Sequence, residues 1–215
     1  MKKSLILMVL LAICLVFSVS AAGTVNITSI QASTATVDPG QTVTYTVVVG
    51  NTHATEIIPT MEFTSTSLTK GSDTIAVPTI SAISNIANLT EQTFTFNVVA
   101  PASQSAGTYV AILTAQESGN SANKATLTFS LTVNSISMLS ASEQNLGFYA
   151  EPGEPSEKSI IFTNTGNREL TNLNFSNLVI NWEGEDEDDT DVQISPTTRT
   201  SLLPGQTVSV KYEIE

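Results

Sequence analysis

The chain has 215 residues with 20 acidic and 8 basic side chains, which gives a formal net charge of −12 at pH 7. This negative charge argues against a general affinity for nucleic acid or for an anionic membrane surface. One histidine and one cysteine, the latter within the first 22 residues, provide neither a histidine-based zinc site nor a cysteine nucleophile.

Residues 1–22 have the order of a secretory signal peptide. Two lysines precede an apolar run at 5–17, and small residues fill 18–22. The apolar run is too short to cross the about 30 Å of hydrocarbon in a bilayer. We therefore expect a signal helix that is cleaved after Ala21 or Ala22, a secreted or cell-surface protein without disulfides, and no stable membrane span after cleavage.

Alternation of apolar and polar residues with a period of two recurs along the rest of the chain. In residues 42–49, for example, every second side chain is apolar. Such alternation predicts half-buried β-strands. Turn-forming groups that contain glycine separate the strands at the intervals of a β-sandwich, and about seven strands are expected between Val25 and Val133. The sequence thus predicts an immunoglobulin-like β-sandwich over residues 23–134.

The second half of the sequence repeats three markers of the first half at nearly the same spacing. The markers are Pro-Gly at 39–40 and 152–153, Asn-Thr at 51–52 and 164–165, and the segment 89–94 with its counterpart 203–208. Agreement at three markers indicates a duplicated module. We therefore expect a second immunoglobulin-like sandwich over residues 135–215, joined to the first without a Pro- or Gly-rich linker and so held in a restrained arrangement.

The second module ends early when it is compared with the first. Beyond Val98 the first module continues through two more predicted strands. The second module reaches Glu215, the last residue of the sequence, at the position that corresponds to Val99 or Ala100. We expect the second sandwich to be incomplete and to lack its last strands. Because an unpaired sandwich edge is an aggregation hazard, the natural chain is expected to extend by about 35 residues or a partner to donate strands.

Several turn and strand motifs resemble those of a known group of domains. The motifs are Pro39-Gly40-Gln41-Thr42-Val43, Ala100-Pro101, Gly107-Thr108-Tyr109, Asn164-Thr165-Gly166-Asn167 and Leu203-Pro204-Gly205-Gln206-Thr207. With these motifs, residues 24–215 resemble the CARDB and NPCBM-associated immunoglobulin-like domains of exported archaeal and bacterial surface proteins. The resemblance implies tandem modules that serve as spacers, in cell adhesion or in S-layer-like assembly, and no catalytic residues. It also implies that Tyr109 is a structural tyrosine-corner residue.

Acidic side chains gather in residues 183–191, between a predicted strand at 178–182 and one that begins at Val192. Several carboxylate oxygens on one loop suit Ca²⁺. The candidate ligands are Asp186, Asp188, Asp189 and Asp191. Because the loop lacks the glycine and the terminal glutamate of an EF-hand, the alternative is a solvated acidic loop without an ion.

Three further kinds of residue carry candidate roles. His53 lies beside a turn, and no Gly-x-Ser-x-Gly nucleophile elbow accompanies it in the sequence. These two observations favour a structural turn residue over a member of a catalytic triad. Trp182 shares one strand face with apolar neighbours, which favours core packing over sugar stacking. Acceptor sequons for N-glycosylation begin at Asn26, Asn88 and Asn174.

These features predict a non-enzymatic exported cell-envelope protein whose immunoglobulin-like modules act in spacing, adhesion or surface assembly. The alternative is an accessory carbohydrate-binding or spacer module of a larger exported enzyme. No catalytic or cofactor-binding residue is expected, and Ca²⁺ is the one candidate ion. The expected partners are other envelope proteins or surface glycans.

Overall fold

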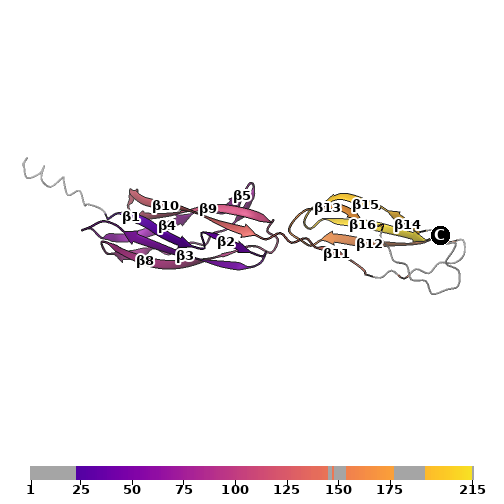
Figure 1. Ribbon diagram of the computed structural model, residues 1–215, viewed down its shortest axis with the longest axis horizontal. Helices are drawn as coiled ribbons and strands as arrows, with labels where there is room; N and C mark the ends of the chain where they lie inside the picture. The colour runs from indigo at the N-terminus through magenta and orange to yellow at the C-terminus, as the bar shows by residue number, and fades with distance from the viewer. Residues whose placement is uncertain (1–22, 145–146, 148–153, 177–191, 215) are drawn as a thin grey trace, which may run out of the picture.

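A computed structural model describes residues 23–144, 147, 154–176 and 192–214 of the chain (Figure 1). These residues form strands and connecting turns without a helix, which confirms the predicted all-β class. Consequently, none of the described segments is a helix of the length and hydropathy that a membrane crossing requires. The predicted signal helix at 1–22 lies outside the described residues.

The N-terminal region, residues 23–134, holds ten strands in two sheets. They are β1 (Val25–Gln31), β2 (Thr34–Val37), β3 (Thr42–Asn51), β4 (Ile58–Ser65), β5 (Leu68–Lys70), β6 (Asp73–Ile75), β7 (Ile83–Ile86), β8 (Thr90–Val99), β9 (Gly107–Glu117) and β10 (Asn120–Val133). One sheet has the order β1-β3-β8 and the other β2-β10-β9-β4-β7, with β5 pairing β6 and β9. The sequence predicted about seven strands, fewer than the ten observed. The difference arises because alternation cannot be recognised in strands of three or four residues, such as β2 and β5 to β7.

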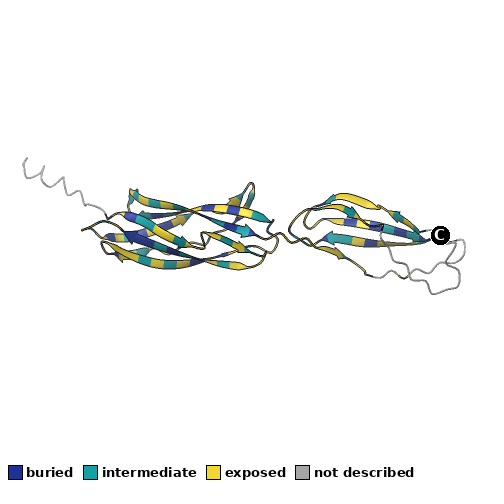
Figure 2. Cartoon of the chain, viewed as in Figure 1, coloured by how far each residue is buried: buried dark blue, intermediate teal, exposed yellow. Residues whose placement is uncertain are grey.

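The core of the N-terminal region lies between these two sheets, where Figure 2 shows the buried positions. Tyr45 on β3 is fully buried, and its ring centroid lies 5.3 Å from that of Phe96 and 4.9 Å from that of Phe129. Its hydroxyl donates a hydrogen bond of 2.9 Å to the Ser130 carbonyl on the opposite sheet. Tyr45 therefore joins the two sheets through both packing and a hydrogen bond.

The stability of the N-terminal region is expected to depend on pH through Tyr45. Burial raises the pKa of Tyr45 to about 12, above the ordinary value of about 10. The folded state holds the phenolic proton more tightly than the unfolded state, so this group's contribution to stability is complete below pH 10 and falls as the pH rises through 12. We expect the urea midpoint of the N-terminal region to decrease over this range, and less steeply in a Tyr45→Phe variant. An equal slope in the two proteins would contradict the assignment.

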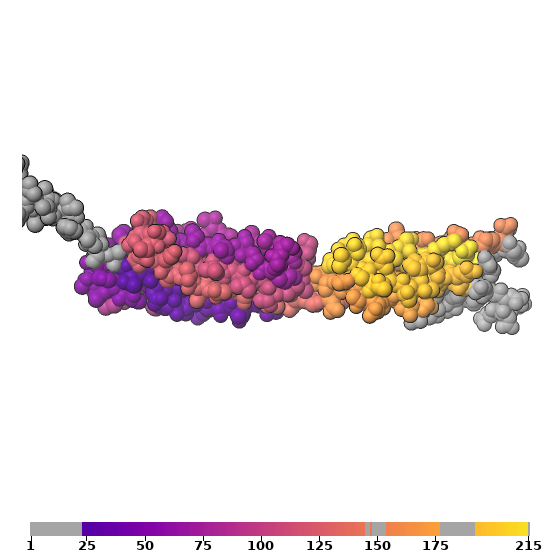
Figure 3. Space-filling view, turned by 90° about the horizontal axis from the view of Figure 1, so that it is seen from above, coloured from indigo at the N-terminus to yellow at the C-terminus, as the bar shows by residue number. Residues whose placement is uncertain are grey.

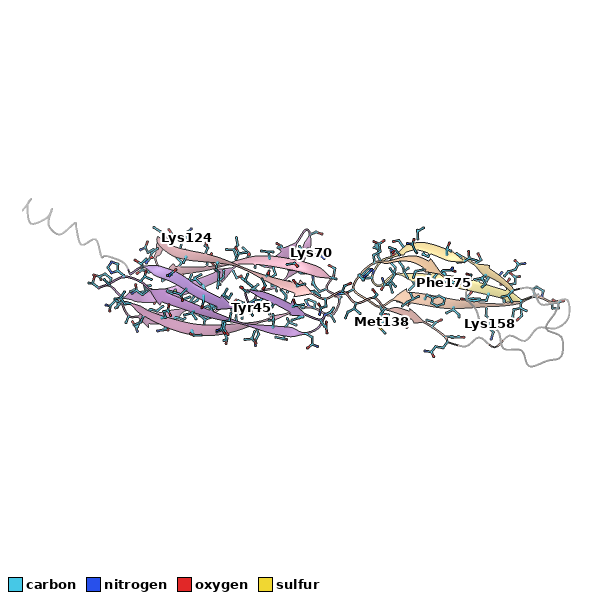
Figure 4. The ribbon with its side chains drawn as sticks, viewed as in Figure 1. Tyr45, Lys70, Lys124, Met138, Lys158 and Phe175 are labelled. Atoms are coloured by element: carbon cyan, nitrogen blue, oxygen red, sulfur yellow. The ribbon has the colours of Figure 1, made fainter. Side chains whose placement is uncertain are left out.

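The C-terminal region contains six strands within the described residues. They are β11 (Leu139–Ala141), β12 (Ser156–Asn164), β13 (Leu170–Asn174), β14 (Val192–Ser195), β15 (Thr198–Leu202) and β16 (Thr207–Ile214). Four form a sheet of order β11-β12-β16-β14, and β13 pairs with β15 in a second sheet. A separate core lies between these sheets and includes Phe175, Leu202 and Tyr212. Figure 4 shows Phe175 inside this region.

The two regions share part of their topology. The set β1-β3-β8 corresponds to β11-β12-β16, and the pair β4-β7 corresponds to β13-β15. Among the described residues of the C-terminal region, no strand corresponds to β9 or β10. The two regions lie end to end and form one elongated body (Figure 3).

The register of the repeat differs by two residues from the sequence alignment. Asn51 lies opposite Thr90, whereas the amide of Asn164 donates to the Gln206 carbonyl. Thr90 therefore corresponds to Gln206, not to Pro204 as the markers suggested. The turns before β8 and β16 match, since Leu89 and Gly205 both have a positive φ. The extra residues of the second region lie earlier, because 38 positions separate Asn164 from Leu202 and only 35 separate Asn51 from Ile86.

Candidate functional site at the junction of the two regions

Three segments meet where the N-terminal region joins the C-terminal region. They are the loop 101–107 before β9, the connection 134–138 after β10, and the turn 164–168 after β12. The connection is anchored at its first residue, because the Asn134 amide donates to the Val37 carbonyl at 2.8 Å and its side chain donates to Asp38 at 2.7 Å. The chain therefore leaves β10 in a fixed direction.

Asn164 builds the turn on the C-terminal side of the junction. Its side chain is fully buried and donates to the carbonyls of Arg168 and Leu202, both at 2.8 Å, while its oxygen accepts from the Gly166 amide at 3.0 Å. These bonds fix both ends of the turn and tie β12 to β15 in the other sheet. The side chain satisfies backbone groups that would otherwise be buried without partners.

Asn51 has the same role in the N-terminal region. It is 2% exposed, donates to the carbonyls of Glu56 and Ile86, and accepts from the amides of Thr24 and His53. The duplicated Asn-Thr motif is thus a connection between sheets in each region.

Asn167, at the tip of the turn 164–168, bonds to both other segments of the junction. Its side chain donates to the carbonyls of Gln104 and Asn134, at 3.1 and 2.8 Å, and accepts from the Ile136 amide at 2.7 Å. Its backbone donates to the Ile136 carbonyl at 3.0 Å and accepts from the Ala106 amide at 3.2 Å. Asn167 is only 4% exposed. We call this set of five hydrogen bonds the Asn167 clamp.

Gly166 permits the close approach on which the Asn167 clamp depends. A Cβ atom at this position would overlap the Ile136 carbonyl and would lie 2.9 Å from the Met138 amide nitrogen. In the native chain the Gly166 amide instead donates to the Met138 carbonyl at 3.2 Å. Figure 4 shows Met138 at this boundary between the regions.

A tyrosine corner holds the loop 101–107 that the Asn167 clamp contacts. The Tyr109 hydroxyl donates to the Ser105 carbonyl at 2.8 Å and accepts from the Gln104 side chain at 2.8 Å. This geometry confirms the structural role predicted for Tyr109. The loop is therefore fixed by its own region, and it presents the Gln104 carbonyl and the Ala106 amide in positions that Asn167 can use.

Lys70 supports the same loop from the β5-β6 hairpin, near the junction end of the N-terminal region (Figure 4). Its ammonium donates to the Ala106 carbonyl at 2.5 Å and lies 5.2 Å from the centroid of the Tyr109 ring. The hydrogen bond from Ser105 is the main cause that lowers the pKa of Asp73, and the nearby Lys70 charge adds to it. The ionised Asp73 thus contributes stability that is lost as the pH falls through its folded-state pKa.

The predicted Ca²⁺ ligands Asp186, Asp188, Asp189 and Asp191 lie outside the described residues, as does Trp182. Elsewhere in the part of the chain that the structure describes, no group of three or more histidine, cysteine or acidic side chains is placed to hold a metal ion.

The three sequon asparagines lie at separate places on the surface. Asn26 is half-buried on β1, whereas Asn88 and Asn174 are exposed. Asn88 donates to the Ala54 carbonyl at 2.8 Å, and Asn174 accepts from the Ser176 amide at 2.9 Å. Asn88 and Asn174 are therefore more exposed than Asn26, and glycosylation at the three sequons stays a prediction.

His53 is half-buried in a turn, and its ring interacts with the backbone. The Nδ1 atom accepts hydrogen bonds from the amides of Thr55 and Glu56, at 3.3 and 3.0 Å. These bonds support a structural role in the turn, as the sequence suggested.

Comparisons with known proteins give few matches. No protein-family model and no curated protein matches the chain. The solved structures that match include one described as the secreted serine protease VesC from Vibrio cholerae, with 9% sequence identity and a TM-score of 0.35. The alignment covers 89% of this chain and 46% of that chain, so this chain spans less than half the length of the matched protein.

The prediction that the chain is not an enzyme is corrected by this comparison. The match to a protein described as a secreted serine protease contradicts it, and we withdraw it. The prediction was based on the resemblance to domains without catalytic residues, on the single histidine and on the missing nucleophile elbow beside it. None of these excludes a part in a larger catalytic protein. At a TM-score of 0.35 the likeness transfers neither fold, nor residues, nor reaction to this chain.

Sequence reasoning missed Gln104 and Asn167 as functional residues. The Asn-Thr-Gly-Asn motif was recognised as a turn, but the partners of the Asn167 side chain lie 31, 33 and 63 positions away. The available signal was the contrast between Gly166-Asn167 and the matching residues His53-Ala54. This contrast indicates that the second turn faces a different environment from the first.

Proposed function

We propose that the chain is an exported cell-envelope or secreted protein whose two immunoglobulin-like modules, at residues 23–134 and 135–215, form a rigid spacer. The export signal is the order of charged, apolar and small residues at 1–22. The immunoglobulin-like assignment is supported by the paired sheets, the shared topology and the tyrosine corner at Tyr109.

The observation that carries the proposal is the Asn167 clamp. A connection between two modules is ordinarily a hinge unless the interface is large or specifically bonded. Here five hydrogen bonds converge on one buried asparagine, and Gly166 brings two backbones into contact. A connection with this geometry transmits orientation from one module to the next, which is what a spacer requires.

The two parts of the proposal have separate tests. Mass spectrometry of the chain from the native host is expected to find it in the envelope or medium, beginning at Ala22 or Gly23. Small-angle X-ray scattering of that purified chain is expected to give the profile of one extended rod. Recovery of the chain in the cytoplasm with residues 1–22 intact would contradict export, and a profile that requires a mixture of bent shapes would contradict the spacer.

A further inference from the structure

Strand β8 has a free edge. All residues of the N-terminal region around this edge are described, because the structure covers residues 23–144 without a gap. In the sheet β1-β3-β8, only one edge of β8 is paired. The amide of Ala100, directly after β8, donates to the Gln41 carbonyl at 2.9 Å and thus points toward the β3 side. Because backbone groups alternate in direction along an antiparallel strand, the amide and carbonyl groups of Thr95 and Asn97 point to the free edge.

A groove of about 460 Å³ runs along this edge. Residues 78–83 line one side and residues 94–97 of β8 line the other. Ile80, Ile83 and Phe94 give the groove an apolar floor against the core, and none of the lining side chains is charged. No backbone hydrogen bond joins residues 78–82 to β8, so this segment covers the core beside the edge without pairing with it.

The C-terminal region shows what occupies the equivalent edge. Strand β16 corresponds to β8, and β14 pairs with it in antiparallel register, with Gln193 opposite Glu213 and Ser195 opposite Lys211. In the register of the repeat, this position faces residues 95–98 of β8, beside the groove. The sequence of β14 is Val-Gln-Ile-Ser, which is uncharged, and Ile194 packs against the C-terminal core.

We propose that the free edge of β8 binds an extended, uncharged peptide segment of a partner protein. The segment adds to the sheet as a fourth strand antiparallel to β8, as β14 does on β16, and apolar side chains at alternate positions enter the groove. The uncharged lining matches an uncharged strand. A second copy of this chain is disfavoured as the occupant, because each copy carries a formal net charge of −12 and like charges repel. This site does not depend on the proposed spacer function.

The test uses the purified chain and a fluorescein-labelled hexapeptide, Thr-Val-Gln-Ile-Ser-Thr, which is the β14 sequence with a threonine at each end. Fluorescence anisotropy is expected to show saturable binding. Thr95→Pro removes the central free-edge amide hydrogen and is expected to weaken binding about tenfold, whereas Thr95→Val keeps that hydrogen and is expected to bind as the native chain does. Equal binding by the two variants, or no binding by the native chain, would overturn the proposal.

A second comparison holds even if Thr95→Pro fails to fold. In the β14 register the amides of Gln and Ser face the host strand and that of Ile faces away. N-methylation of Gln and Ser is therefore expected to abolish binding to the native chain, and N-methylation of Ile to preserve it. The same loss from both would overturn the strand geometry. Sedimentation that shows a dimer which the peptide dissociates would overturn the partner assignment in favour of a second copy.

Discussion

Replacement of Asn164 by alanine is expected to lower the free energy of unfolding of the C-terminal region by about 3 kcal/mol. The variant loses two donated bonds and one accepted bond, and it leaves the buried carbonyl of Leu202 without its side-chain partner. It also releases both ends of the turn 164–168. Peptide-resolved hydrogen exchange measures this loss separately in each region.

The repeat provides both a parallel and a control for this experiment. Asn51→Ala is expected to destabilise the N-terminal region by a similar amount, because Asn51 makes the equivalent bonds. Asn97→Ala removes one exposed hydrogen bond from Thr44 and is expected to cost less than about 0.5 kcal/mol. If Asn164→Ala costs no more than Asn97→Ala, the two asparagines do not hold the sheets together.

Replacement of Gly166 by alanine is expected to open the junction while each core stays folded. The added Cβ displaces the turn from the backbone at Ile136 and Met138, and the Asn167 clamp loses its geometry. Five hydrogen bonds at about 1 kcal/mol each make the closed junction dominant in the native chain. Asn167→Ala removes the three side-chain bonds and is expected to act in the same direction.

Limited proteolysis at the connection 134–138 measures this opening. Cleavage is expected to be at least about tenfold faster in Gly166→Ala than in the native chain, because exposure of the connection requires the clamp to open. Gly147→Ala is the matched control, since a Cβ at that position meets no atom within 4 Å. Equal cleavage rates in all three proteins would show that the clamp does not hold the junction closed.

The parts of the fold that depend on local pattern were predictable from the sequence. Alternation identified β3 and β8, and the Gly-Thr-Tyr motif located the tyrosine corner at Tyr109. The register of the repeat was wrong by two residues because the additional residues of the second region lie between Asn164 and Leu202, a stretch without a repeated marker. The strands β5 and β6 were missed since three residues are too few to show a period.

The junction could not be derived in this way. The absence of a Pro- or Gly-rich linker predicted a restrained arrangement, but not the residue that restrains it. The polar groups around Asn167 come from two other segments of the chain, which only folding brings to it. The free edge of β8 could not be derived from the sequence either, because the sequence of a strand does not show whether both of its edges are paired.

The most direct test of a rigid junction is the distance between two spin labels, one in each region. Thr128→Cys on β10 and Ser209→Cys on β16 are exposed positions, and the native cysteine at position 14 precedes the expected cleavage site. Double electron–electron resonance on the cleaved chain is expected to give one narrow distance distribution, which broadens when Asn167→Ala is added. A broad distribution in the unaltered junction, unchanged by Asn167→Ala, would contradict the rigid spacer.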